Sequence, residues 1–226
     1  MNAKDTGTYK AEGGGEESDT AAGAENIESS STAGQTETEA LTETPEALAD
    51  LETEIDSILS QTDGIWSIHV KNLETGESLS MNNQRMYAAS LIKLFVMEAM
   101  IEQSDNESYN ELVRLESDAD SFSEDCGTLL EEIYNGTCVS EEASGEMLQL
   151  LLNQQSVSKI PEGVPEGIQV ANKTGETDDS QHDAAIVFGE ETDYILCIMS
   201  SECSDQSQAI SVIQTISQTV YEYLNP

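Results

Sequence analysis

The sequence predicts a protein of the α/β (α+β) class, built on a mostly antiparallel sheet flanked by an N-terminal and a C-terminal helix. Two observations lead to this fold. Two strand-like runs come early in the chain, and three more come together near its end, with several helix-like segments between the two blocks. Strands grouped in this way favour an antiparallel sheet, whereas a doubly wound parallel sheet requires strands and helices to alternate.

The first 44 residues differ in composition from the rest of the chain. Residues 1–44 are mainly Gly, Ser, Thr, Ala and Glu, with almost no large apolar side chains. Such a segment cannot bury enough apolar surface to offset the entropy lost on ordering. We therefore expect a disordered acidic tail over residues 1–44 and a folded domain over residues 45–226.

The folded part opens with signals for a helix and a hairpin. Thr44 can cap a helix whose first residue is Pro45. Apolar side chains then recur at helical spacing, at Leu48, Leu51, Ile55 and Leu59. Alternation with polar residues next predicts a half-buried strand, with Trp66, Ile68 and Val70 on one face. A turn over residues 74–76 and a second strand over residues 78–81 complete the hairpin.

Helices dominate the middle of the chain. An apolar helix is predicted over residues 90–100, and a short apolar pattern follows over residues 109–113. Another helix ends at Tyr134, before the Asn135-Gly136 break. Ser140 is expected to cap the next helix, because its hydroxyl can accept from a free backbone N–H. The apolar face of that helix carries Met147, Leu148 and Leu151.

The C-terminal part contains a block of strands and a final helix. Pro161 and Pro165 indicate a loop, after which strands are predicted over residues 170–174, 184–188 and 194–199. The last helix begins near Ser204-Asp205. The side chains that we expect this helix to bury are Ile210, Ile213, Ile216, Val220 and Leu224.

The charge of the chain limits its partners. Asp and Glu together number 45 and Lys and Arg together 8, so the formal net charge is −37. Such a surface repels nucleic acid and anionic lipid, and it favours solubility. The sequence has no apolar run long enough to span a membrane. Residues 1–10 have no apolar core, so no secretion signal is visible.

Four cysteines leave the redox state open. Cys126, Cys138, Cys197 and Cys203 allow three pairings. Small buried thiols are as good an interpretation as a disulfide, and the preferred pair is Cys126 with Cys138, which a short helix and turn can bring together. The cysteines form no Cys-x-x-Cys motif and have no metal-ligand spacing to the two histidines. The sequence therefore predicts no metal site and no cofactor.

Three short motifs point to a chemistry. They are Ser90-Leu91-Ile92-Lys93, Ser104-Asp105-Asn106 and Lys173-Thr174-Gly175. The first begins an apolar helix after a hairpin, and the third lies on a strand that precedes two more strands and a terminal helix. In these motifs, their order and their contexts, residues 45–226 resemble the class A β-lactamases and penicillin-binding serine hydrolases. An ordinary turn at a strand edge remains the alternative for Lys173-Thr174-Gly175.

The residues themselves suit acyl transfer. A serine hydroxyl is a weak nucleophile until a neighbouring base takes its proton. Residues three apart share a helix face, so Lys93 can reach the Ser90 hydroxyl. A lysine acts as a base only when it is neutral, which burial and a second cation such as Lys173 would favour. Ser90, at a helix start, also offers its backbone N–H to an oxyanion.

The resemblance assigns further roles. It implies that Lys173 and Thr174, followed by Gly175, bind a substrate carboxylate, and that the Glu176 backbone N–H is the second oxyanion donor. Ser104 would be a proton shuttle and Asn106 a substrate-binding residue. The implied partner is a β-lactam or a peptidoglycan-like amide, and family members usually act outside the cytoplasmic membrane, so we expect an extracellular or cell-surface protein.

Two features depart from the family pattern, and both reduce the helical part. Ser104 follows Ser90 by only 14 positions, and an unbroken helix would separate them by about 21 Å. Ser104 meets Ser90 within one molecule only if the helix ends early, near Glu98. The loop whose glutamate activates the deacylating water is also missing. The carboxylates left in its place, more typical of a solvated acidic loop, are Glu116, Asp118, Asp120 and Glu124.

Three hypotheses follow for function. The first is a serine hydrolase that is acylated on Ser90 and releases its product slowly. The second is a non-catalytic surface or ligand-binding protein that keeps the fold. The third is a domain that its deletions have made too unstable to fold alone. The Ser90–Lys93 pair favours the first hypothesis, and the missing loop favours the other two.

Overall fold

A five-stranded antiparallel sheet organises the domain, as the sequence predicts. The computed structural model describes residues 46–102 and 120–226. The strand order is β2-β1-β7-β6-β5, and each neighbouring pair is antiparallel. The strands are β1 (Ile65–Asn72), β2 (Ser78–Met81), β5 (Gln169–Glu176), β6 (Gln181–Phe188) and β7 (Tyr194–Ser201). A separate two-residue pairing joins β3 (Met86–Tyr87) to β4 (Asp120–Ser121).

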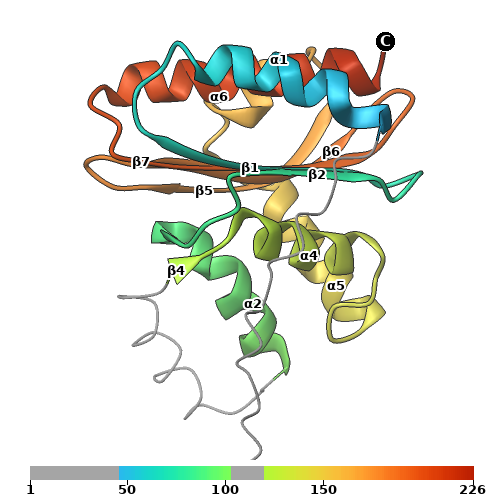
Figure 1. Ribbon diagram of the computed structural model, residues 1–226. Helices are drawn as coiled ribbons and strands as arrows, with labels where there is room; N and C mark the ends of the chain where they lie inside the picture. The colour runs from blue at the N-terminus through green and yellow to red at the C-terminus, as the bar shows by residue number, and fades with distance from the viewer. Residues whose placement is uncertain (1–45, 103–119) are drawn as a thin grey trace, which may run out of the picture. The chain divides into compact units, whose positions relative to one another are not determined.

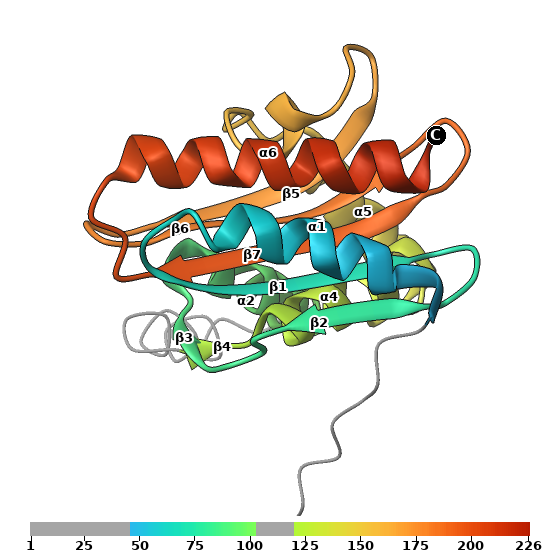
Figure 2. The same ribbon diagram turned by 45° about the horizontal axis from the view of Figure 1, so that its top comes forward.

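Helices cover both faces of the sheet (Figure 1). One face carries α1 (Ala49–Leu59) and α6 (Gln206–Leu224), which lie side by side (Figure 2). The other face carries α2 (Lys93–Glu102), α4 (Ser123–Tyr134) and α5 (Glu141–Leu152). Three 3₁₀ turns complete the described elements: η1 (Glu46–Leu48), η2 (Ala89–Ile92) and η3 (Ile160–Gly163). Among the described residues, no helix is both long and apolar enough to cross a bilayer.

The two faces of the sheet bury different side chains. The core under α1 and α6 is aliphatic and aromatic, with Leu51, Ile55, Ile213 and Ile216 fully buried. The core under α2, α4 and α5 contains three of the four cysteines and is bordered by buried serine and histidine side chains. The central strands β1, β7 and β6 have helices on both sides (Figure 1), and most of their residues are buried whichever face they point to.

That double coverage corrects the prediction of a half-buried first strand. Ser67 and His69, which the alternation assigned to solvent, are 0% and 4% exposed. Each has a polar partner: Ser67 Oγ lies 2.8 Å from Ser123 Oγ on α4, and His69 Nδ1 lies 2.8 Å from Ser80 Oγ on β2. Buried polar groups are tolerated when they are hydrogen-bonded, so α4 can pack on a partly polar strand face.

Helix boundaries agree with the sequence in three places, and the buried face of one helix differs at one position. Ser140 caps α5, since its Oγ accepts from the Ala143 N–H at 3.1 Å. The helix that ends at Tyr134 is α4, and Asp205 caps α6. The first α-helix, α1, begins at Ala49 after a 3₁₀ turn, and the predicted cap Thr44 and first residue Pro45 lie outside the described residues. In α6, Ile210 is only half-buried, because Ala209 and Val212 occupy the buried positions instead.

All four cysteines are free and buried. The preferred pairing of Cys126 with Cys138 is therefore wrong, and the alternative of small buried thiols is the one observed. Burial raises the pKa of the Cys126 thiol to about 11, since an apolar environment disfavours the thiolate. Residues 1–44 and the apolar pattern at residues 109–113 lie outside the described residues.

Candidate active site

A 3₁₀ turn presents Ser90 at the start of α2. The expected helix begins with this turn, η2, and becomes α-helical only at Lys93. Leu91 and Leu94 are fully buried and fix the turn in the core. Ala89 has a φ of 47°, a left-handed conformation that is uncommon for a residue with a Cβ. The buried leucines on one side hold the half-buried Ser90 toward the other.

Lys93 reaches the serine hydroxyl. Its Nζ lies 3.4 Å from Ser90 Oγ, at the long end of hydrogen-bond distance, as the i, i+3 spacing predicts. Lys93 is exposed, however, whereas we expected it to be buried. The local pairing was predictable from spacing, whereas the solvent access was not.

The Lys173-Thr174-Gly175 motif lies on β5, the edge strand next to the Ser90 turn. A Cβ built on Gly175 would lie 3.1 Å from the carbonyl oxygen of Ala88 and 3.2 Å from the backbone nitrogen of Leu91. These atoms belong to backbone and cannot rotate away, so glycine permits the close approach of strand and turn. The structure thus brings together the first and third motifs, which are 80 residues apart in the sequence.

Lys173 is half-buried, whereas Lys93 is exposed. Desolvation lowers the pKa of Lys173, and the positive charge of Lys93 lowers it further. Its Nζ donates to the backbone carbonyl of Thr174. Two cations therefore face the same small region, and an anionic group placed between them would relieve their repulsion.

His182, on β6, connects the sheet to the segment just before Ser90 by hydrogen bonds. Its Nδ1 accepts from the Ser200 N–H at 3.2 Å, so Nε2 carries the proton and donates to the Tyr87 carbonyl at 3.0 Å. The ring is fully buried, and desolvation lowers its pKa to about 4. A neutral histidine thus fixes the approach to Ser90. Sequence reasoning weighed this residue only as a metal ligand and missed this role.

A second polar cluster lies behind β5. Lys159 is 2% exposed, and its Nζ donates to the carbonyl oxygens of Gly175 (3.1 Å) and His182 (3.0 Å). Asp183 is fully buried and accepts from Asn172 Nδ2 and from the Ile160 N–H, each at 3.0 Å. Desolvation raises the pKa of Asp183 to about 7, although these bonds and Lys159 oppose the shift. The rarity of lysine in so acidic a chain was the only sequence signal for Lys159.

For the other predicted site residues, the structure describes only some of the side chains. Ser104 and Asn106 lie outside the described residues. The helix does not end near Glu98, because α2 continues to Glu102. Among the loop carboxylates, Glu124 is exposed and accepts from Asn83 Nδ2 at 2.7 Å. The Glu176 side chain is exposed, and its carboxylate lies 3.8 Å from Lys159 Nζ.

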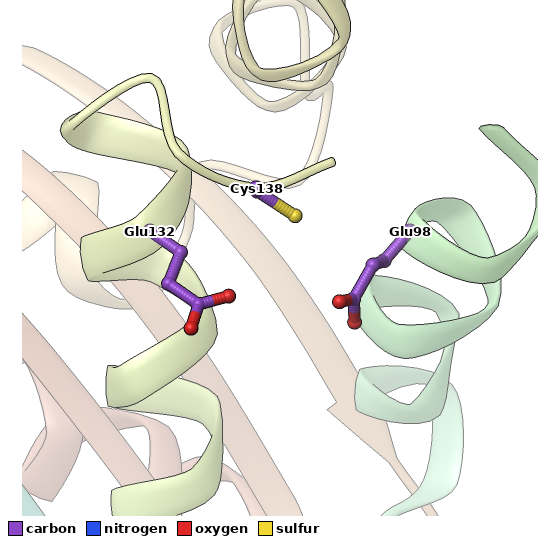
Figure 3. Close-up of side chains that lie close together, drawn as sticks. All are labelled: Glu98, Glu132 and Cys138. Atoms are coloured by element: carbon purple, nitrogen blue, oxygen red, sulfur yellow. The ribbon is translucent and has the colours of Figure 1, made fainter. Parts of the chain in front are cut away.

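One group of side chains has the composition of a metal site (Figure 3). The carboxylates of Glu98 on α2 and Glu132 on α4 face each other beside the buried Cys138 thiol, and one ligand atom of each lies within 4.8 Å of the others. Carboxylate and thiolate ligands would suit zinc. The sequence predicted no metal site, because these residues come from separate segments without motif spacing. Exposed acidic groups often come together without an ion, and no second feature of the described residues indicates one.

Comparison with known proteins identifies the family. The model of the β-lactamase enzyme family matches residues 50–121 and 108–224. No curated protein matches the sequence significantly.

Solved structures share the fold. PBP-A is 18% identical, with a TM-score of 0.67 over 77% of this chain and 96% of its own. TLA-3 extended-spectrum β-lactamase is 14% identical, with a TM-score of 0.70 over 78% and 99%. A class A β-lactamase from Bacteroides cellulosilyticus DSM 14838 is 15% identical, with a TM-score of 0.68 over 79% and 98%.

The fold and the ordered motifs define a domain of the β-lactamase and penicillin-binding serine hydrolase type. The chain belongs to the β-lactamase enzyme family. The resemblance that the three motifs indicated is therefore confirmed.

Proposed function

We propose that this domain is a serine acyl-transfer enzyme that β-lactams or cell-wall-peptide-like amides acylate on Ser90. One observation carries the proposal: Lys93 Nζ lies 3.4 Å from Ser90 Oγ, while the Lys173-Thr174-Gly175 strand packs directly against the same turn. A nucleophile, a base within reach and a cationic strand edge are the parts that acylation by a carboxylate-bearing amide requires.

The reaction divides among these residues. Lys93, when neutral, takes the Ser90 proton as Oγ attacks the substrate carbonyl, and the C–N bond breaks as the amine leaves with a proton. The developing oxyanion is bound by the backbone N–H groups of Ser90 and Glu176. Lys173 and Thr174 hold the substrate carboxylate. The positive charge of Lys93 is one cause of the lowered pKa of Lys173, and an anionic ligand would offset that repulsion.

We further propose that hydrolysis of the acyl-enzyme is slow. The glutamate that activates water in the family's hydrolysing members has no counterpart in this sequence, and the exposed Glu124 is engaged by Asn83. A solved PBP-A variant is described as an acyl-enzyme complex with penicillin G, and its fold matches this chain at a TM-score of 0.67. A cell-surface or extracellular location is proposed with this function, because that is where family members usually act.

Intact-mass analysis after incubation with penicillin G tests the proposal. One adduct per chain on Ser90 is expected, persisting for longer than the adduct of a hydrolysing β-lactamase. Ser90→Ala should form none. If Ser90→Ala still forms the adduct, the nucleophile is another residue. A folded wild-type protein that takes no adduct from penicillin or a peptide amide would favour the non-catalytic alternative.

A further inference from the structure

Lys159 approaches the candidate site from the opposite face of the sheet. Its neighbour Ile160 belongs to the core under α6, and the Ile160 N–H bonds Asp183, whose side chain shares that face. The Lys159 ammonium nevertheless ends at two carbonyls, those of Gly175 and His182, which are opposite each other in the β5–β6 register. A carbonyl oxygen has two lone pairs, so it can accept from Lys159 in addition to its bond in the sheet.

The hydrogen-bond pattern of the hairpin sets the direction of the Gly175–Glu176 peptide. The Thr177 N–H donates to the Ser180 carbonyl at 3.1 Å, which makes these two residues a hydrogen-bonded pair. Such pairs recur at every second residue of an antiparallel ladder, so Gly175 and His182 form the next one. The Gly175 carbonyl therefore points toward β6. The N–H of a trans peptide points the opposite way, so the Glu176 N–H faces the free edge of β5.

The Ser90 turn packs on the outermost strand of the sheet. A Cβ at Gly175 would meet the backbone of Ala88 and Leu91, so the turn lies against the face of β5, and β5 is the last strand. The carbonyl of a single peptide group is thus bound by Lys159 on one side, while its N–H is presented toward the site on the other. Chains of hydrogen bonds polarise one another, and a charged donor does so more strongly than a neutral one.

The surroundings of Lys159 hold it in place. Gln214 Nε2 on α6 donates to the Ser158 carbonyl at 2.8 Å, and Ser217 Oγ on α6 donates to the Ile160 carbonyl at 2.8 Å. The residues before and after Lys159 are therefore both fastened to α6. A buried ammonium is costly unless it is hydrogen-bonded, and Lys159 donates to one carbonyl on β5, the strand that carries Lys173, and to one on β6.

We propose that Lys159 is a positioning residue that fixes and polarises the Gly175–Glu176 peptide, which makes the Glu176 N–H a stronger donor to the oxyanion. This inference rests on the proposed function, in which that N–H binds the developing charge. The competing view is that Lys159 only neutralises Asp183. The two views differ in the result expected when the charges of Lys159 and Asp183 are removed together. The proposal expects the Glu176 amide to change, and the competing view expects it to stay as in wild type.

The test uses the double variant Lys159→Met/Asp183→Asn in the full-length chain, in which neither charge is left unpaired. Its matched control is Lys71→Met/Glu131→Gln, which removes another cation–carboxylate pair (2.6 Å) between β1 and α4. In the first variant, the Glu176 amide proton resonance should move upfield and its hydrogen exchange should accelerate. The control should leave this amide unchanged. This readout does not require that the protein be catalytic.

Acylation provides the second readout. The rate of penicillin adduct formation should fall about 10-fold in the first variant, less than the 10²–10³-fold usual for losing a whole oxyanion donor. Affinity for a phenylboronic acid, which forms a tetrahedral adduct with serine, should fall in parallel, and the control should match wild type. If wild type takes no penicillin, the proposed function fails, while the amide readout still decides what Lys159 does.

Two outcomes would overturn the inference. One is a folded double variant whose Glu176 amide keeps its wild-type shift and exchange rate. The other concerns pH 5.5, where Asp183 is protonated and needs no cation beside it. If the double variant and Lys159→Met are both unfolded at this pH, Lys159 serves stability alone.

Discussion

The two faces of the sheet are built from different chemistry. The face under α1 and α6 is packed with aliphatic side chains, interrupted by the Lys159–Asp183–Asn172 cluster at its edge. The face under α2, α4 and α5 buries Ser67, His69, His182 and three thiols, and it carries Ser90 and Lys93. The aliphatic core and the reactive groups are thus separated by one layer of strands. A change in either should have limited effect on the other, except at Lys159, which bonds the strands next to the site.

The largest effect is expected on the aliphatic face. Ile213→Ala on α6 removes a fully buried side chain and should destabilise the domain by about 2 to 5 kcal/mol. Ser211→Ala, at an exposed position of the same helix, should stay within about 0.5 kcal/mol of wild type. Denaturant unfolding measures both. At temperatures where Ile213→Ala remains folded, its adduct formation should match wild type; a matched loss of both properties would contradict the separation of the faces.

On the site face, Lys93→Ala should act on chemistry rather than on stability. The side chain is exposed, so unfolding should change little. Adduct formation should slow by about 100-fold or more, the usual scale for loss of a general base. Stopped-flow or timed mass analysis of acylation measures the rate. An unchanged rate would mean that another group takes the serine proton.

Gly127→Ala probes the packing of α4 on the sheet. A Cβ at this position would lie 2.3 Å from Cδ2 of the buried His69 ring, so the helix or the ring must move, at a cost of about 1 to 3 kcal/mol. Gly145→Ala is the matched control in α5, where a Cβ meets nothing within 4 Å. The control should be stabilised by about 0.5 to 1 kcal/mol, because alanine favours helix. Equal stability changes in the two variants would contradict tight packing at His69.

The smallest net effect on stability is expected from a change of pH, because titrating groups on the two faces change stability in opposite directions. Burial lowers the pKa of His69 and of His182 to about 4, so between pH 6.5 and 4 the unfolded chain binds more protons, and stability falls as pH falls. Asp183, with a pKa raised to about 7, has the opposite sign between pH 7 and 4. Thermal unfolding should show a modest net loss on acidification. Asp183→Asn should make that loss steeper; a shallower loss would be inconsistent with these signs.

The sequence predicted what depends on local pattern. The five strands of the main sheet, the cap at Ser140 and the start of the last helix near Asp205 follow from periodicity and from local polar signals, and the Ser90–Lys93 pair follows from helical spacing. Burial of Ser67 and His69 did not follow, because their partners lie on α4 and β2 and no local rule reveals a distant hydroxyl.

Other features of the site were missed for the same reason. Lys159 and His182 bind backbone carbonyls far along the chain, and a carbonyl has no residue identity that a motif could record. The exposure of Lys93 depends on what packs around α2. The disulfide prediction was wrong because proximity in the sequence does not fix how two thiols lie in a core.

The four free thiols give each side of the sheet a native chemical reporter. Cys126, Cys138 and Cys197 lie in the core that carries the site, and Cys203 lies in the core under α1 and α6. A buried thiol reacts with an alkylating reagent only while its surroundings are open. Burial also raises the pKa of the Cys126, Cys197 and Cys203 thiols, which slows their reaction further. Alkylation rates, read by peptide mass, would therefore report the opening free energy of each layer separately, without any label being introduced.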